Sequence, residues 1–426
     1  MEEDDHISRL PDAVLGEIVS LLRTKESGRT QAIASRWCHI WRSAPLNLDL
    51  HNRAPSERRI PLAQISGILS SHRGPGRRFS IPRHYFENDA HPAATLDAWL
   101  GTPALDGLQE LDFHYGSWHT RQGSPARPLP ESARRFLSTL RVASFGHCTF
   151  PDENGLILPL LKQLSLMHVK ISENSLYALL AGFPLLQSLM LTQSIGCSRI
   201  RIVSRTLRSI GVHASWGDTM LDQFTIEDAP FLERFLLLDL WFPKKMGSDV
   251  VNSTTVLPSM RVLALTHNNF SLDEVIAFMK CFPCLENLYI KMSTAYGQLT
   301  KTKVTNAWRQ KYRNLIGTLD IRLKKIVLSA YLGNNAHVKF AEFFVLNARV
   351  LESMVLQVDV SNYHNKAWIE RQQTLLQIEE RASRGARFDF VSHSSRPVSC
   401  EHIWYEQVHD LSKADPFVGF DYWATG

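Results

Sequence analysis

A short apolar pattern recurs through most of this chain and limits the folds that it can adopt. The pattern is an apolar residue, two others, a second apolar residue, one other, and a third apolar residue. Its copies begin at Leu108, Leu140, Leu161, Leu186, Leu207, Leu232, Met260, Leu285, Leu323 and Leu351. The last two apolar positions are two residues apart, so they point to the same face of a short strand. The pattern therefore predicts a series of short strands, each with one buried face.

The spacing of the copies predicts how these strands are arranged. Successive copies begin 32, 21, 25, 21, 25, 28, 25, 38 and 28 residues apart. Most of these steps lie in or near the range of about 20–29 residues that leucine-rich repeats have. We therefore predict an α/β fold in which the repeats form a solenoid, with parallel strands on the concave face and helices on the convex face. The alternative is a generic strand–helix domain in which the triplets only mark buried strands.

The repeats are expected to be irregular. A regular leucine-rich repeat has Asn or Cys three positions after its last apolar residue, where the side chain satisfies the backbone of a turn. Only Cys148 and Asn268 fill this position clearly. Apolar stripes with helical spacing predict convex-side helices within residues 176–183, 272–279 and 340–344.

The first fifty residues carry two further apolar stripes with helical spacing. The stripes are Leu15, Ile18, Val19 and Leu22, followed by Ile33, Trp37, Ile40 and Trp41. Two helices of about three turns each cannot bury two tryptophans against one another. We therefore predict that Trp37 and Trp41 are left uncovered by their own chain and are sheltered by another subunit.

This N-terminal segment resembles the F-box. The matching residues, in order, are Ile7, Ser8, Leu10, Pro11, Asp12, Thr24, Lys25, Arg29, Thr30, Ser35, Arg36, Trp37 and Trp41. Arg23 departs from the family pattern, because plant members usually have proline there. The resemblance implies docking to a Skp-type adaptor, which bridges to a cullin ubiquitin ligase. The alternative is an ordinary helical hairpin that packs on the chain's own next domain.

The residues expected to contact the adaptor are the apolar residues of this segment. They are Leu10, Pro11, Leu15, Ile18, Val19, Leu22, Ile33, Trp37 and Trp41. Leu10, Pro11 and Trp37 match the family motif most directly. Buried aromatic anchors usually dominate the energy of an interface, at about 2 kcal/mol or more each.

The C-terminal part resembles a second plant module. Residues 323–356 read as strand, helix and strand, and they resemble the FBD domain that follows the repeats in many plant F-box proteins. The residues beyond, which include Trp368, Arg371, Leu375, Leu376 and Ile378, resemble grass members of that group. The terminal unit of a solenoid must cover an open edge, so capping is a sufficient role for this part.

These observations predict five parts. We expect an all-helical F-box at 1–50, a linker with the first solenoid elements at 51–104, leucine-rich repeats at 105–320, an FBD-like terminal repeat at 321–360, and a C-terminal capping extension at 361–426. Two insertions, at 116–130 and 291–318, interrupt the repeats, and loops on a rigid scaffold often bind partners. The aromatic residues of the second insertion can equally pack back onto the scaffold.

The sequence gives little sign of catalysis or of metal binding. Phosphate-binding glycine loops, nucleophile elbows and His-Glu-x-x-His pairs do not occur, so we predict no catalytic residue, cofactor or metal. Cys281 and Cys284 lack a second ligand pair nearby, and burial as small residues explains them better than zinc does. The six scattered cysteines favour reduced thiols and therefore a cytoplasmic or nuclear protein. The net charge of +5 is small for this length, so nucleic acid is not an expected partner, and neither is a membrane.

The sequence therefore predicts a non-catalytic receptor. Its F-box would dock to the Skp-type adaptor, and through it to a cullin, while the repeats and the FBD-like part would bind an unknown target protein for ubiquitination. The alternative function is a repeat scaffold that binds the adaptor without ligase function.

Overall fold

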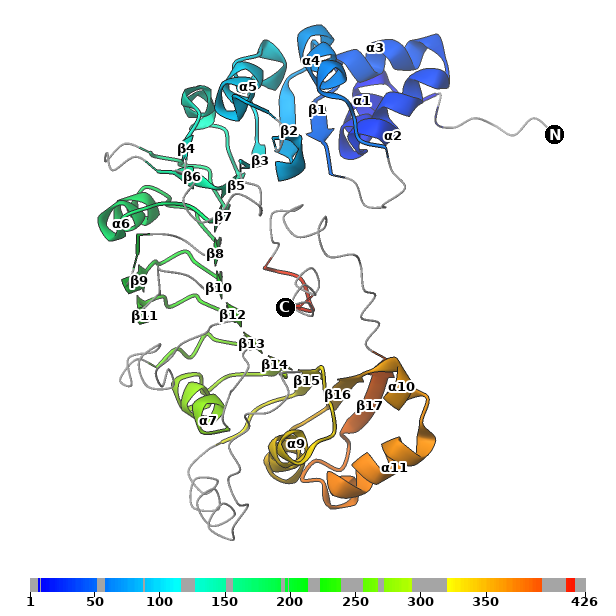
Figure 1. Cartoon of the computed structure of the whole chain (residues 1–426), viewed down its shortest axis with the longest axis vertical. Helices are drawn as coiled ribbons and strands as arrows, with labels where there is room; N and C mark the ends of the chain where they lie inside the picture. Colours follow the sequence, from blue (N-terminus) through cyan, green and yellow to red (C-terminus); the bar gives the residue numbers. More distant parts are fainter. Residues whose placement is uncertain are drawn as a thin grey trace, which may run out of the picture. The chain divides into compact units, whose positions relative to one another are not determined.

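The computed structural model describes residues 7, 9–51, 58–86, 89–115, 127–150, 156–192, 196–197, 199–213, 223–238, 256–266, 272–292, 320–392 and 411–417. They belong to two compact units. Unit 1 contains Met1–Leu186, and unit 2 contains Gln187–Gln193, Cys197–Cys400 and Asp410–Gly426. Figure 1 labels the helices and strands of both units.

Unit 1 begins with helices and continues as a parallel sheet. Its α-helices are α1 (Asp12–Leu21), α2 (Thr24–Arg29), α3 (Ser35–Ser43), α4 (Leu62–Ser71), α5 (Pro92–Leu100) and α6 (Glu173–Ala181). Its 3-10 turns are η1 (Thr30–Ala32), η2 (Arg83–Tyr85), η3 (Pro103–Leu105) and η4 (Glu131–Phe136). Its strands pair in the order β1 (Leu46–Asp49), β2 (Gly76–Ile81), β3 (Glu110–His114), β5 (Val142–Gly146) and β7 (Gln163–Met167). A second small sheet joins β4 (Arg127–Pro128) and β6 (Cys148–Thr149).

Unit 2 is built on the same plan. Its strands pair in parallel in the order β8 (Ser188–Thr192), β10 (Ser209–His213), β12 (Arg234–Leu238), β13 (Val262–Thr266), β14 (Asn287–Lys291), β15 (Lys325–Ser329), β16 (Ser353–Val358) and β17 (Arg387–Ser392). Its helices are α7 (Leu272–Cys281), α9 (Asn335–Asn347), α10 (Val360–Tyr363), α11 (Lys366–Leu375) and the 3-10 turn η5 (Ile378–Glu380). A two-stranded sheet of β9 (Arg199–Val203) and β11 (Gln223–Asp228) takes the place of a helix in one stretch.

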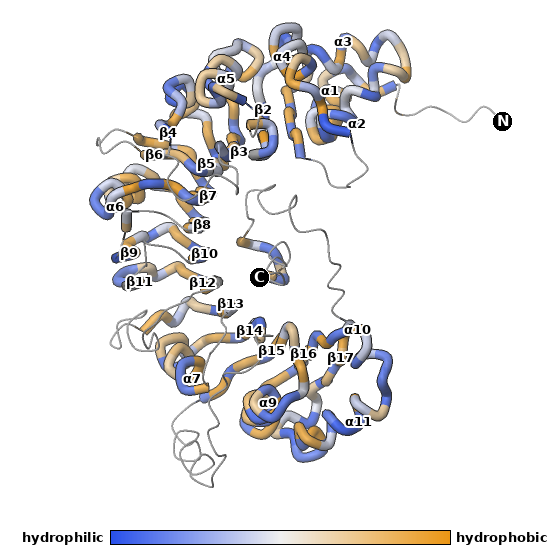
Figure 2. Tube along the Cα trace, in the orientation of Figure 1, coloured by the Kyte–Doolittle hydropathy of each residue, from blue (hydrophilic) through white to orange (hydrophobic). Residues whose placement is uncertain are grey.

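The strand register explains why the apolar triplet repeats. In unit 2 the second position of each triplet lies beside the second position of the next, as in Leu189, Ile210 and Phe235. These residues are fully buried and form a continuous line of core side chains across the sheet. The last two positions of every predicted triplet lie on a strand and the first lies two residues before it, including the triplet with the small residue Ala143, which pairs with Leu111. The predicted leucine-rich solenoid of parallel strands is confirmed, and Figure 2 shows the apolar character of these strands.

The predicted helices also form, and their starts have physical causes. Ser172 caps α6 by accepting a hydrogen bond from the backbone of Ser175, and Asn334 caps α9 in the same way. α7 ends at Cys281, before a proline that cannot continue a helix. Asn268 and most of the two insertions lie outside the described residues, as do Tyr296, Trp308 and Tyr312.

The segment after the FBD-like repeat extends the sheet of unit 2 rather than only covering it. β17 pairs in parallel with β16, so the strands continue to Ser392. Between them, Gln372 of α11 accepts a hydrogen bond from the fully buried Tyr331 at 3.0 Å. This contact ties the helix that follows the FBD-like repeat to the turn after β15.

The burial of His337 in α9 predicts that the stability of unit 2 depends on pH. Its Nδ1 accepts a hydrogen bond from the backbone N–H of Leu332 at 3.0 Å, and burial lowers its pKa from 6.5 to about 4. Between those pH values the unfolded chain binds a proton that the folded chain does not, so stability falls as pH drops. We expect the move from pH 7.5 to pH 5 to cost about 2 kcal/mol more in the wild type than in His337→Gln, measured by chemical denaturation. An equal loss in both proteins would contradict this assignment.

Candidate adaptor-binding surface and its attachment to the repeats

The N-terminal helices enclose their own apolar core. Six residues form the buried cluster: Leu15, Val19, Trp37, Ile40, Trp41 and Ala44. Trp37 is only 7% exposed and Trp41 only 8%. The prediction that both tryptophans remain uncovered is therefore wrong.

The cover comes from a helix that the two-helix argument left out. Ile68 of α4 packs against the cluster, and the ring of His72, just after α4, meets the Trp41 ring edge-on at 5.5 Å. The indole N–H of Trp41 donates to Ser27 Oγ at 3.2 Å, so its polar group is satisfied too. His72 is held by a 2.8 Å contact between its Nε2 and the carbonyl of Ala44, and burial lowers its pKa. The helical domain thus needs residues beyond 50 to be complete.

An exposed apolar surface nevertheless remains on these helices. Val14, Ile18 and Leu21 lie four and three residues apart on α1, so they share one face, and they are 44%, 41% and 66% exposed. Ile7 and Ile33 are also largely exposed. We call the three residues of α1, Val14, Ile18 and Leu21, the N-terminal apolar surface. Clustered exposed apolar residues, as opposed to single ones, typically mark an interaction site.

The predicted adaptor contacts divide into two groups. Leu15, Val19, Trp37 and Trp41 are buried in the core of the helical domain and are not accessible to a partner. The others reach the surface at least in part: Leu10, Pro11, Ile18, Leu22 and Ile33.

Sequence reasoning missed Val14 and Leu21. The signal was present, because α1 carries two apolar stripes and only the one through Leu15 and Val19 faces the core. The second stripe, through Val14, Ile18 and Leu21, has the same helical spacing.

Arg36 fixes the segment that leads into this surface. Its Nε donates to Asp12 Oδ1 at 2.7 Å, and its Nη2 donates to the carbonyl of Leu10 at 2.7 Å. These bonds hold the Leu10–Asp12 segment beside the start of α3. Asp12 also lies in the first turn of α1, where a negative charge suits the helix dipole.

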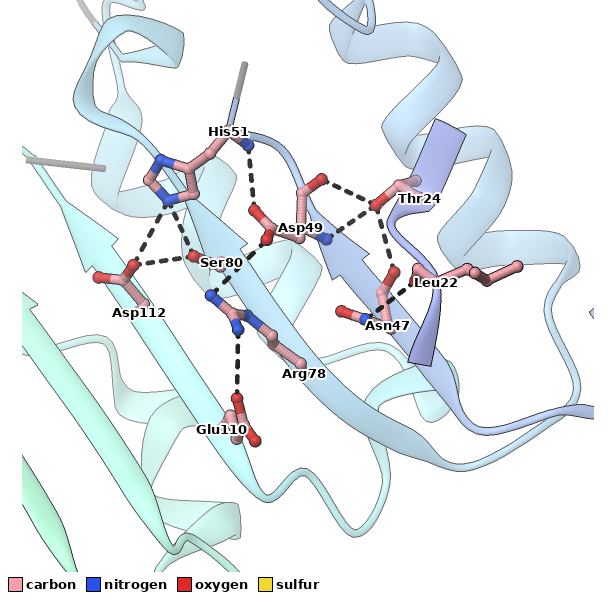
Figure 3. A network of polar contacts seen from close by, with 9 residues as sticks. All are labelled: Leu22, Thr24, Asn47, Asp49, His51, Arg78, Ser80, Glu110 and Asp112. Atoms are coloured by element: carbon pink, nitrogen blue, oxygen red, sulfur yellow. Dashed lines mark hydrogen bonds and ion pairs between the residues drawn. The ribbon is translucent and has the colours of Figure 1, made fainter. Parts of the chain in front are cut away.

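Thr24 joins the helical domain to the first strand of unit 1 (Figure 3). Its Oγ1 accepts a hydrogen bond from the N–H of Asp49 at 2.8 Å and donates toward the Asp49 carbonyl at 2.9 Å. Asn47 of the same strand donates through Nδ2 to the carbonyl of Leu22 at 3.0 Å. Because these bonds link both sides of the α1–α2 junction to β1, the helices are fixed to the strand rather than hinged on it.

The same network continues across the sheet as ion pairs. Arg78 on β2 lies 3.6 Å from Asp49 on β1 and 3.5 Å from Glu110 on β3. The cation therefore bridges carboxylates on the two neighbouring strands, as Figure 3 shows.

His51, Ser80 and Asp112 lie together in this network without forming a catalytic triad. A triad needs the carboxylate at Nδ1 and the hydroxyl at Nε2 of the same histidine. Here Nε2 lies 2.9 Å from Ser80 Oγ and 3.4 Å from Asp112, and Ser80 itself donates to Asp112 at 2.8 Å. All three side chains are buried. Their contacts connect the residue just after β1 with β2 and β3.

The predicted absence of a metal site concerned Cys281 and Cys284. Both are half-buried free thiols, and burial raises the pKa of Cys281. Among the residues with a described position, no group of three or more His, Cys, Asp or Glu side chains is placed to hold a metal ion. None of the helices in the described ranges has the length and apolar character to cross a membrane.

Comparisons with known proteins extend these observations. Residues 96–252 and 244–290 match the family model described as the leucine-rich repeats of FBD-associated F-box protein At5g56370, and residues 310–356 match the FBD family model. The Arabidopsis thaliana F-box/FBD/LRR-repeat protein At1g51370 is 26% identical over 313 residues, which is 68% of this chain and 67% of that protein.

Two further Arabidopsis thaliana relatives give the same result. F-box/LRR-repeat protein 13 is 27% identical over 247 residues, covering 56% of this chain and 52% of that protein. F-box/FBD/LRR-repeat protein At5g53840 is 21% identical over 418 residues, covering 84% and 89%. The repeats and the FBD match known families in the order in which the sequence predicts them, and the chain is similar to plant F-box proteins that carry leucine-rich repeats and an FBD.

Proposed function

We propose that the chain is the substrate-recognition subunit of a ubiquitin ligase of the Skp–cullin–F-box type. The observation that carries the proposal is the N-terminal apolar surface, which remains exposed although the helical domain has completed its own core. Such a surface is suited to a protein partner, and the F-box resemblance supports a Skp-type adaptor as that partner. The repeats and the FBD would bind the target.

The mechanism is proximity. A target lysine held near a charged conjugating enzyme reacts at a raised effective concentration, and no chemistry by this chain is required. The Thr24 and Asn47 bonds support this role, because a receptor transmits position only when its adaptor-binding helices are fixed to its first strands.

The test is adaptor binding by a variant with charge on the exposed stripe of α1. We expect Ile18→Asp/Leu21→Asp to weaken binding of a Skp-type adaptor at least a hundredfold in calorimetry, because two desolvated apolar contacts are lost. Leu62→Asp is the matched control, since Leu62 is also an exposed apolar helical residue, at 43%, and lies outside the surface. Its binding should equal that of the wild type.

Unchanged adaptor binding by the double variant would contradict the surface assignment. Co-purification of the cullin tests the ligase role separately. Recovery of the adaptor without a cullin would favour the alternative of a scaffold without ligase function.

A further inference from the structure

The sheet of unit 2 carries an apolar row on the face opposite its core. The middle residue of each strand lies beside the middle residue of the next and points away from the buried triplet positions. From β8 to β15 these residues are Met190, Gly211, Leu236, Ala264, Tyr289 and Val327. We call them the apolar row.

The corresponding row of unit 1 is polar. There the middle residues are Ser80, Asp112, Ser144 and Ser165. These four residues are buried, and Ser80 and Asp112 satisfy their polar groups in the cluster with His51, whereas leucine, tyrosine and valine are covered only by other apolar groups. The apolar row of unit 2 therefore needs an apolar cover.

The chain's own residues 411–417, which we call the tail segment, provide that cover. Leu411 and Phe417 are buried in one cluster with five residues of the apolar row and with Val262. The Phe417 ring meets the Tyr289 ring edge-on at 6.2 Å. A Cβ added to Gly211 would lie 2.5 Å from the Met190 sulfur and 3.3 Å from the Leu411 side chain, so a glycine on β10 leaves room for Met190 and for this anchor.

Polar contacts fix the backbone of the tail segment between its two anchors. The Tyr289 hydroxyl donates to the carbonyl of Ala414 at 3.0 Å, and Arg234 donates to the carbonyl of Lys413. Contacts to the main chain hold a peptide whatever its side chains are at those positions. Recognition of side chains is therefore concentrated at the two apolar anchors.

Charge adds a second requirement. The ammonium of Lys325 lies 5.7 Å from the centre of the Tyr289 ring, and Arg234 lies on the same face. Burial raises the pKa of Tyr289, and the carboxylate of Asp415 in the tail segment raises it further. The guanidinium of Arg234 lowers it. The Asp415 carboxylate also accepts a hydrogen bond from the backbone N–H of Phe417 at 2.9 Å, and the two cations on this face of the sheet favour an acidic residue between the anchors over a basic one.

We propose that the apolar row is a peptide-docking surface, and that its partner is a target segment with two apolar anchors separated by five residues and an acidic residue between them. The tail segment occupies this surface as an internal competitor, and a target must displace it. A tethered segment competes at an effective concentration on the order of millimolar, so only targets with good anchors succeed. That the docked peptide belongs to a ubiquitination target rests on the proposed function, whereas the docking of a peptide on the apolar row does not.

The experiment uses the full chain and a fluorescent synthetic peptide of residues 409–419. We expect the peptide to bind Leu411→Ala/Phe417→Ala at least tenfold more tightly than the wild type, since the variant vacates the surface. Phe417→Ala alone should give about a fivefold gain and serves where the double variant does not fold. Lys413→Ala is the matched control, because its side chain is exposed and its carbonyl is retained; it should match the wild type.

Oxidation of Met190 gives an independent measure. This residue is buried beneath the tail segment, so peroxide should oxidise it faster in the double variant, and added peptide should restore its protection. A peptide in which both anchors are alanine should neither bind nor protect.

Equal peptide binding by folded wild type and double variant, or equal binding of the anchorless peptide, would overturn the proposal. Adaptor binding measured in the same preparations should be unchanged in every tail variant. If the wild type does not bind the adaptor, the ligase role is refuted and the peptide result still holds.

Discussion

Replacing Trp41 with alanine is expected to lower the local stability of the N-terminal helices by about 3–5 kcal/mol. The side chain is almost completely buried, it meets His72, and its N–H donates to Ser27, so the variant loses packing and leaves a cavity beside a polar group. Hydrogen exchange of peptides from α1 and α3 should report the loss as faster local opening.

The contrast with an exposed residue makes this prediction specific. Ile33→Ala removes an apolar side chain that is 63% exposed, and its effect on stability should stay within about 0.5 kcal/mol. Peptides from unit 2 should exchange at the wild-type rate in both variants. Comparable exchange of α1 and α3 in Trp41→Ala and in the wild type would mean that the tryptophan does not hold these helices together.

Replacing Gly74 with alanine is expected to cost about 3 kcal/mol or more. A Cβ at this position would lie 2.2 Å from the carbonyl oxygen of Ala44 and 2.5 Å from that of Ser43, and neither backbone atom can swing aside. Gly74 also donates its N–H to the carbonyl of Arg42 at 3.1 Å, which holds the end of α3 against the entry to β2. The substitution therefore loosens the attachment of the helices to the sheet.

Gly67→Ala is the matched control for this prediction. A Cβ at Gly67 would meet nothing within 4 Å, and Gly67 lies inside α4, where alanine is the better helix former. We expect a gain of about 0.5–1 kcal/mol there. Hydrogen exchange of α3, β1 and β2 distinguishes the two variants, and similar exchange in both would show that Gly74 is not sterically required.

The repeat could be predicted from the sequence because its signal is local. Each triplet specifies a short strand by itself, and the register rows then follow from stacking identical units, as Leu189, Ile210 and Phe235 illustrate. Even the weak triplet with Ala143 was predicted correctly, since its neighbours supply the larger side chains of the row.

The candidate site was predicted less well, because its details depend on contacts between distant residues. Trp41 is covered by His72, 31 positions further along the chain, and no spacing rule within the first fifty residues reveals this. The cover of the apolar row by Leu411 and Phe417 is more distant still. In both cases the local apolar pattern indicates that these side chains need to be covered, and only the fold shows which residues cover them.

The last strand of unit 2 bears on how the protein avoids aggregation. β17 ends the sheet among the described strands, and an edge of this kind offers unpaired backbone groups to other chains. Two of its three exposed positions carry the charged residues Arg387 and Asp389, the third carries Val391, and Phe388 and Phe390 are partly covered. Charged residues at these positions oppose the stacking of one molecule's final strand on that of another, so the row of strands can stop there without becoming a seed for fibres.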